Sequence, residues 1–186
     1  MSDRGGSLSS SEAIAALTGL IDGFVGGAGW IPAVEVIAVE QVPLPARSLL
    51  AHQRHMTATL KAFHGCNLRL EVLAERCDGE FYRRMIALTT ERDGGVAEFG
   101  VVRLRLSLVD PDVRHAVLDR SSPIGDVFET HRVLTRVEPR WLLRFPTGGP
   151  VLEYLRLPPG REAFGRLGVI HCNGQAAVEL LEVVPG

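Results

Sequence analysis

The sequence predicts a single α+β domain in which an antiparallel sheet of roughly six strands is covered by helices. Several short runs alternate apolar and polar residues, which is typical of strands with one buried and one exposed face. Two glycine-containing turns, Asp93-Gly94-Gly95 and Asn173-Gly174, each join neighbouring runs as a hairpin. Helix-start signals such as Asp110-Pro111 separate other strands. Together these features favour one layered domain.

The N-terminal segment predicts a helix followed by a linker. Ser9 to Ser11 can cap the helix, and its apolar residues recur at helical spacing as far as Ile21. The glycine-rich stretch 23–29 ends it, and because no Lys-Ser or Lys-Thr pair follows, this stretch is not a P-loop. We therefore divide the chain into an N-terminal helical and glycine-rich segment, residues 1–30, and a main domain, residues 31–186.

Alternation, proline breaks and capping residues predict the other elements. Helices are expected over residues 55–63, 110–118 and 123–131. Strands are expected over residues 34–42, 68–72, 82–90, 102–108, 133–145, 168–172 and 176–184. A proline- and glycine-rich connection covers residues 146–160. The last hairpin should place Ile170 and Val178 in the core.

Composition and charge are those of an ordinary globular protein. The chain has 186 residues, 46% of them hydrophobic and 23% charged, with a net charge of -2. This balance favours neither nucleic acid nor an anionic membrane as a partner. The polar N-terminus does not resemble a signal peptide, and no apolar run approaches the roughly 20 residues that span a bilayer. Three widely spaced cysteines predict no disulfide framework, so we expect a cytoplasmic protein.

Common catalytic and metal-binding patterns are not found. His52, His55 and His64 cluster in sequence, but no HExxH or comparable ligand pattern includes them, so we expect no metal. No GxSxG elbow is present, and neither Cys66 nor Cys172 lies in a nucleophile motif.

Two charged residues lie inside strands that otherwise belong to the core. Arg84 shares a strand face with Ile86 and Leu88, and Glu182 shares one with Val178 and Leu180. A buried ion needs a partner or a ligand, because leaving it unpaired costs several kcal/mol. The pattern therefore indicates either a structural ion pair or a binding site.

Several segments, in order, resemble the chorismate lyase family. They span roughly residues 45 to 184 and are Leu49-Leu50 with 55–60, 84–88, 122–125, 134–136, Gly165-Arg166, 173–175 and Leu181-Glu182. The family's proline after the last hairpin is Ala176 here, and its threonine before the glutamate is Leu181. Glu179 is a rival for the glutamate position, but it lies on the strand face opposite to Glu182.

The resemblance implies a six-stranded antiparallel sheet with helices packed on one face and an enclosed aromatic-acid site. It implies that Arg84 holds the carboxylate of the product, that the Ile124 backbone N–H meets the same carboxylate, and that Met56 forms a wall. Glu182 would lie near the ring hydroxyl, so Arg84 and Glu182 are the implied catalytic residues.

The activity implied is conversion of chorismate to 4-hydroxybenzoate and pyruvate. Aromatisation makes this elimination downhill, so cations and positioning suffice and no cofactor is expected. A second arginine for the enolpyruvyl carboxylate has three candidates, Arg54, Arg83 and Arg136. Two alternatives stay open: an enzyme of the same fold with a related substrate, and a non-catalytic sensor of aromatic acids. The sensors of this fold carry a winged-helix domain, for which the first forty residues are too short. The sequence does not predict the oligomeric state.

Overall fold

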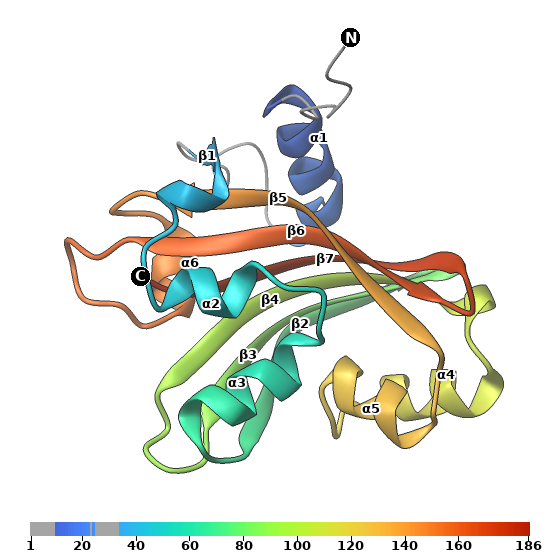
Figure 1. The fold of residues 1–186 in the computed structure, drawn as a ribbon. Helices are drawn as coiled ribbons and strands as arrows, with labels where there is room; N and C mark the ends of the chain where they lie inside the picture. Colours follow the sequence, from blue (N-terminus) through green and yellow to red (C-terminus); the bar gives the residue numbers. More distant parts are fainter. Residues whose placement is uncertain (1–9, 23, 25–33) are drawn as a thin grey trace, which may run out of the picture.

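A computed structural model describes residues 10–22, 24 and 34–186. In this part of the chain, seven strands form one antiparallel sheet in the order β1-β5-β6-β7-β4-β3-β2 (Figure 1). The strands are β1 (Glu35–Ile37), β2 (Leu68–Asp78), β3 (Phe81–Thr90), β4 (Val96–Arg105), β5 (Thr135–Phe145), β6 (Ala163–Cys172) and β7 (Gln175–Pro185). The α-helices are α1 (Ser10–Ile21), α2 (Ala46–Leu50), α3 (Met56–His64), α4 (Pro111–Leu118), α5 (Ile124–Thr130) and α6 (Pro150–Tyr154). The predicted α+β class is confirmed.

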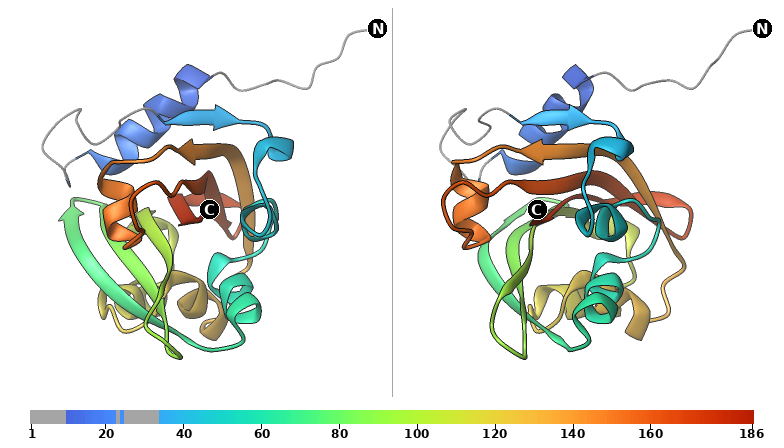
Figure 2. Two further views of the ribbon diagram at one scale, coloured as in Figure 1. Left: turned by 90° about the vertical axis from the view of Figure 1, so that its left-hand side faces the viewer. Right: turned by 60° about the vertical axis from the view of Figure 1, so that its left-hand side comes forward.

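Helices cover both faces of the sheet, whereas the resemblance implied one. Figures 1 and 2 show α1 on the opposite side of the sheet from α3, α4 and α5. Helices α1 and α6 pack with Phe99 and Leu181 in one cluster, while α2 to α5 pack with Leu180 and Val184 in two others. The central strands bury apolar side chains on both faces, so each face needs a cover.

Most predicted elements are found, with changes at their ends. The strand expected at 34–42 is reduced to Glu35–Ile37, because the chain turns at Val39–Gln41, where the Gln41 side chain accepts a hydrogen bond from the Ala38 N–H. Residues Leu106–Leu108, expected in a strand, form a short 3-10 helix, and β4 begins earlier, at Val96. Helix α6 lies inside the connection expected at 146–160.

The predicted N-terminal boundary lies outside the described residues. The division between residues 30 and 31, and nearly all of the glycine-rich stretch, fall there. Helix α1 itself is as predicted and buries Ala13, Leu17, Leu20 and Ile21 in the same core as the sheet. Among the described helices, none combines the length and apolar character that a membrane crossing requires.

The closing hairpin is confirmed. Asn173 and Gly174 have φ values of 50° and 83°, as a type I′ turn requires. Ile170 and Val178 face each other across the β6–β7 ladder and are both buried. The turn therefore fixes the register of the two strands that carry Arg166 and Glu182.

We expect opposite effects from one substitution at two glycines. Gly174→Ala places a Cβ in a left-handed conformation and should lower the free energy of unfolding by about 1–2 kcal/mol. Gly19→Ala, inside α1 with open space around its Cβ, should raise it by roughly 0.5–1 kcal/mol. Urea denaturation of both variants measures the difference. A neutral Gly174→Ala would contradict the turn assigned here.

Candidate functional site

Four strands bring charged side chains to one face of the sheet. Gly100 of β4 lies opposite Glu182 of β7, and Glu182 lies opposite Arg166 of β6. Glu98 precedes Gly100 by two residues, so its side chain belongs to the same face. Arg84 of β3 lies opposite Val102 of β4. Val102 follows Gly100 by two residues, so Arg84 belongs to the same face, on the other side of Gly100 from Glu98. These four side chains, Arg84, Glu98, Arg166 and Glu182, form the buried charge cluster.

A small cavity lies above Gly100. Its volume is about 40 Å³, and Arg84, Glu98 and Glu182 line it together with Thr57 of α3 and Ile124 of α5. The room exists because Gly100 has no side chain. A Cβ there would lie 3.1 Å from Ile86 Cδ1 and 3.2 Å from Glu98 Oε1. Glycine at this position is thus the floor of the cavity.

Arg166 is fully buried and fully hydrogen-bonded. Its Nε donates to Glu182 Oε2 at 2.5 Å, and the side chain has no exposed surface. Its other nitrogens donate to backbone carbonyls between α2 and α3, those of Leu50 at 3.3 Å, His52 at 2.7 Å and Arg54 at 3.1 Å. Arg166 therefore neutralises Glu182 and ties the α2–α3 connection to the sheet.

Arg84 is buried but poorly satisfied. Only 2% of its surface is exposed, and Nη2 donates one long hydrogen bond of 3.3 Å to the Ser122 carbonyl. Within the described part of the chain, Nε and Nη1 have no hydrogen-bond partner. Burial lowers the pKa of Arg84, yet a guanidinium remains a cation at neutral pH. The cavity thus contains a fixed cation whose Nε and Nη1 can donate to an anion.

Glu98 is the second unusual group. Its carboxyl is buried beside Glu182, and burial, together with the negative charge of Glu182, raises the pKa of Glu98 well above the ordinary value. Arg166 opposes this shift only in part, since its ion pair is with Glu182. Burial therefore favours the protonated form of Glu98 relative to an ordinary glutamic acid.

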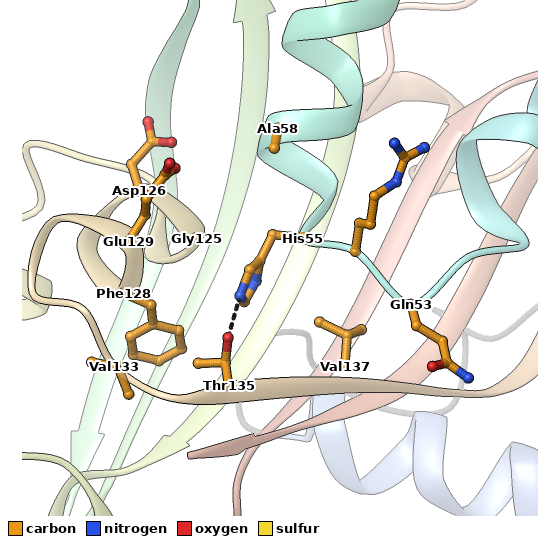
Figure 3. Close-up of a pocket in the computed structure, with 11 residues that line it drawn as sticks. Gln53, His55, Ala58, Gly125, Asp126, Phe128, Glu129, Val133, Thr135 and Val137 are labelled. Atoms are coloured by element: carbon orange, nitrogen blue, oxygen red, sulfur yellow. Dashed lines mark hydrogen bonds between the residues drawn. The ribbon is translucent and has the colours of Figure 1, made fainter. Parts of the chain in front are cut away.

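A larger pocket lies beside the cavity, between α3, α5 and β5 (Figure 3). Its volume is about 390 Å³, within the range of small-molecule sites, and Phe128, Val133 and Val137 give it an apolar wall. His55 Nε2 lies 2.8 Å from Thr135 Oγ1 across it. Burial lowers the pKa of His55, so its imidazole is neutral at pH 7.

The first turns of α3 and α5 separate the two spaces. His55 and Gly125 line the larger pocket, whereas Thr57 and Ile124 line the small cavity. The turns are in close contact, because a Cβ on Gly125 would lie 3.1 Å from Thr57 Oγ1 and 3.3 Å from His55 Cβ. Lys61 and Asp126, 2.8 Å apart, form an ion pair that also joins these helices.

Three of the four expected site residues meet at one place. Arg84, Ile124 and Glu182 line the small cavity. Met56 is buried in the apolar cluster under α2 and α3, and its neighbour Thr57 lines the cavity instead. Of the candidate second arginines, Arg83 points to the opposite face and donates to the Asp22 carbonyl.

Arg166 and Glu98 were not among the predicted site residues. Arg166 shares a strand face with Gly168 and Ile170, because side chains two residues apart lie on the same face. The predicted strand begins only at residue 168, whereas β6 begins at Ala163 and so includes Arg166. Glu98 lies at the start of β4, four residues before the predicted strand, so no alternation marked it.

Two further findings concern metal binding and the reactivity of a cysteine. No three histidine, cysteine or acidic side chains there are close enough to hold a metal ion. Burial raises the pKa of the Cys172 thiol to about 11, which leaves it protonated and unreactive at neutral pH.

Comparison with known proteins gives a likeness of fold. No protein-family model matches the sequence, and no curated protein matches it either. The crystal structure of PhnF from Mycobacterium smegmatis is similar, with 14% identity and a TM-score of 0.52; the similarity covers 71% of this chain and 64% of PhnF. The separately solved effector domain of PhnF has a TM-score of 0.54 at 14% identity, covering 72% of this chain and 89% of that domain. This chain thus matches just under two thirds of the length of PhnF, and the fold, of the chorismate lyase type, is confirmed.

Breaking the buried ion pair should be costly. Arg166→Met leaves Glu182 without its counterion and frees three backbone carbonyls, so we expect a loss of about 3–5 kcal/mol in the free energy of unfolding. Arg144→Met, which removes an exposed pair with Glu35, should cost at most about 1 kcal/mol. Urea denaturation of the two variants measures both losses. Equal losses would show that the buried pair contributes no more than a surface one.

Proposed function

We propose that this chain is a binding domain that holds a small organic carboxylate in the cavity above Gly100, without transforming it. The observation that carries the proposal is Arg84, a buried cation whose Nε and Nη1 have no hydrogen-bond partner in the described structure. A guanidinium donates charge-assisted hydrogen bonds to a carboxylate, so a bound carboxylate would give Arg84 an anionic partner.

The other groups of the site favour recognition over chemistry. Glu182, implied as a catalytic residue, is already held by Arg166, and burial favours the protonated form of Glu98. The similar part of PhnF is described as its effector domain, which agrees with a domain that binds a small molecule. We infer the same kind of role here.

The volume of the cavity limits the ligand. A cavity of about 40 Å³ takes only a few water-sized groups, since roughly 10–15 Å³ of cavity volume holds one water molecule. A carboxylate that carries a ring fits only if the first turns of α3 and α5 move outward, because Thr57 and Ile124 line that side.

A second candidate is the chorismate lyase reaction. It is supported by the meeting of Arg84, Ile124 and Glu182 around one cavity, the arrangement that the family resemblance implies. In that reaction Arg84 would hold a carboxylate and Glu182 would orient the ring hydroxyl.

The binding role makes Arg84 essential. Arg84→Ala should weaken the binding of 4-hydroxybenzoate or butanoate by about 10- to 100-fold, because it removes a charge-assisted contact of roughly 1.5–3 kcal/mol. Arg83→Ala, one residue away on the opposite face, is the matched control and should bind normally. Isothermal titration calorimetry measures both affinities. Normal binding by Arg84→Ala would place the ligand elsewhere.

Incubation with chorismate separates the two candidates. For a binding domain we expect no pyruvate and no 4-hydroxybenzoate above the uncatalysed rate, each followed separately by chromatography. Turnover that is lost in both Arg84→Ala and Glu182→Gln would establish the lyase instead. Pyruvate with a different aromatic product would indicate an enzyme with a related substrate.

A further inference from the structure

The buried charge cluster contains one cation and one acid that have no partner of opposite charge. Arg166 and Glu182 form an ion pair. Glu75 lies opposite Arg84 in the β2–β3 ladder, but its carboxylate accepts from Tyr82 at 2.8 Å and from Arg120 at 2.6 Å. Among the described side chains, Glu75 acts on Arg84 and Arg166 acts on Glu98 only through space, and neither Arg84 nor Glu98 forms an ion pair.

The two unpaired groups lie at different ends of the same cavity. Strands are spaced by roughly 4.8 Å and residues by about 3.3 Å along a strand, so the Cα atoms of Arg84 and Glu98 are about 14 Å apart. Both side chains nevertheless line one small space. A ligand in this space meets a guanidinium at one end and a carboxyl at the other.

We propose that the natural ligand is a zwitterion, a small molecule with a carboxylate at one end and an ammonium group at the other. The carboxylate pairs with Arg84, and the ammonium pairs with Glu98. This inference rests on the proposed binding function and adds the chemical class of the ligand.

Charge balance supports a zwitterion over a simple carboxylate. With Arg84, Arg166, Glu98 and Glu182 all ionised, the cluster has no net charge and matches a ligand that has none. Burial beside Glu182 favours the protonated form of Glu98, which avoids an unpaired buried charge. An ammonium group provides the missing cation, so Glu98 gives up one proton to solvent when the ligand binds, and the ammonium keeps its own.

Among the titratable groups near the cavity, we expect only Glu98 to release a proton when the ligand binds. Arg84 and Glu182 line it from β3 and β7, and Arg166 of β6 remains the ion-pair partner of Glu182. The helices contribute Thr57 and Ile124, which do not titrate. Of the nearby histidines, burial lowers the pKa of His55, and burial together with the charge of Arg166 lowers that of His52 to about 4, so both are neutral at pH 7.

Two matched pairs of probes test the ligand class. They are 4-aminobutanoate with butanoate, and 4-(aminomethyl)benzoate with 4-methylbenzoate. In each pair we expect the amine to bind about 10- to 100-fold more tightly, as a charge-assisted hydrogen bond to Glu98 predicts. Titration calorimetry in phosphate and in Tris, which differ in ionisation enthalpy, should show release of about one proton with the amines and none with the simple carboxylates.

Glu98→Gln is the informative variant. Glutamine has the size of the protonated acid and is neutral, so the fold should be kept, but the preference for the amine and the release of a proton should both disappear. Glu179→Gln is the control, since Glu179 is on β7 but faces the other side of the sheet, where it pairs with Arg103. It should leave both measurements unchanged.

The results of these experiments test the zwitterion separately from the proposed binding function. One contrary result is that simple carboxylates bind in a way that depends on Arg84 while the amines bind no more tightly, and another is that the tighter binding of the amines persists in Glu98→Gln. Either result would overturn the zwitterion and keep the binding function. Failure of all four probes to bind would overturn both.

Discussion

The ion pair between Arg166 and Glu182 is the interaction on which this structure depends. It joins β6 to β7 at the centre of the sheet, and the same guanidinium holds the chain between α2 and α3 through three backbone carbonyls. Because α3 follows directly, its first turn, with His55 and Thr57, is fixed relative to the sheet. The cavity and the neighbouring pocket both take their shape from that turn.

The pair also explains how so much charge is kept in one core. A buried ion pair is stable only when its remaining donors are satisfied, and Arg166 meets this condition while Arg84 does not. The contrast separates a structural arginine from one that is available to a ligand. The sequence leaves both interpretations open for Arg84 and Glu182. In the structure Glu182 has a protein partner, whereas Nε and Nη1 of Arg84 have no hydrogen-bond partner among the described residues.

Much of the fold was accessible from local patterns because local physics decides it. The hairpin at Asn173-Gly174 and the helix start at Pro111 follow from backbone preferences of a few residues. The ends of β4 and β6 were not accessible. Glycines at 165, 168 and 100 weaken the strand pattern there, and long-range pairing with β7 forms the strands regardless. The missed site residues, Glu98 and Arg166, lie in those two segments, so errors in strand ends became errors in the site.

Gly100 has a consequence for how the binding site can change over evolutionary time. The floor of the cavity is backbone, which has no alternative rotamer and cannot move aside for a larger molecule. Any single substitution there adds atoms and makes the space smaller, so natural variation at this residue can only narrow the range of accepted molecules. A wider range must come from the opposite wall, where Thr57 and Ile124 belong to helices that can be repositioned. Selection for new ligands in relatives of this domain should therefore act on the helices, while the strand beneath stays the same.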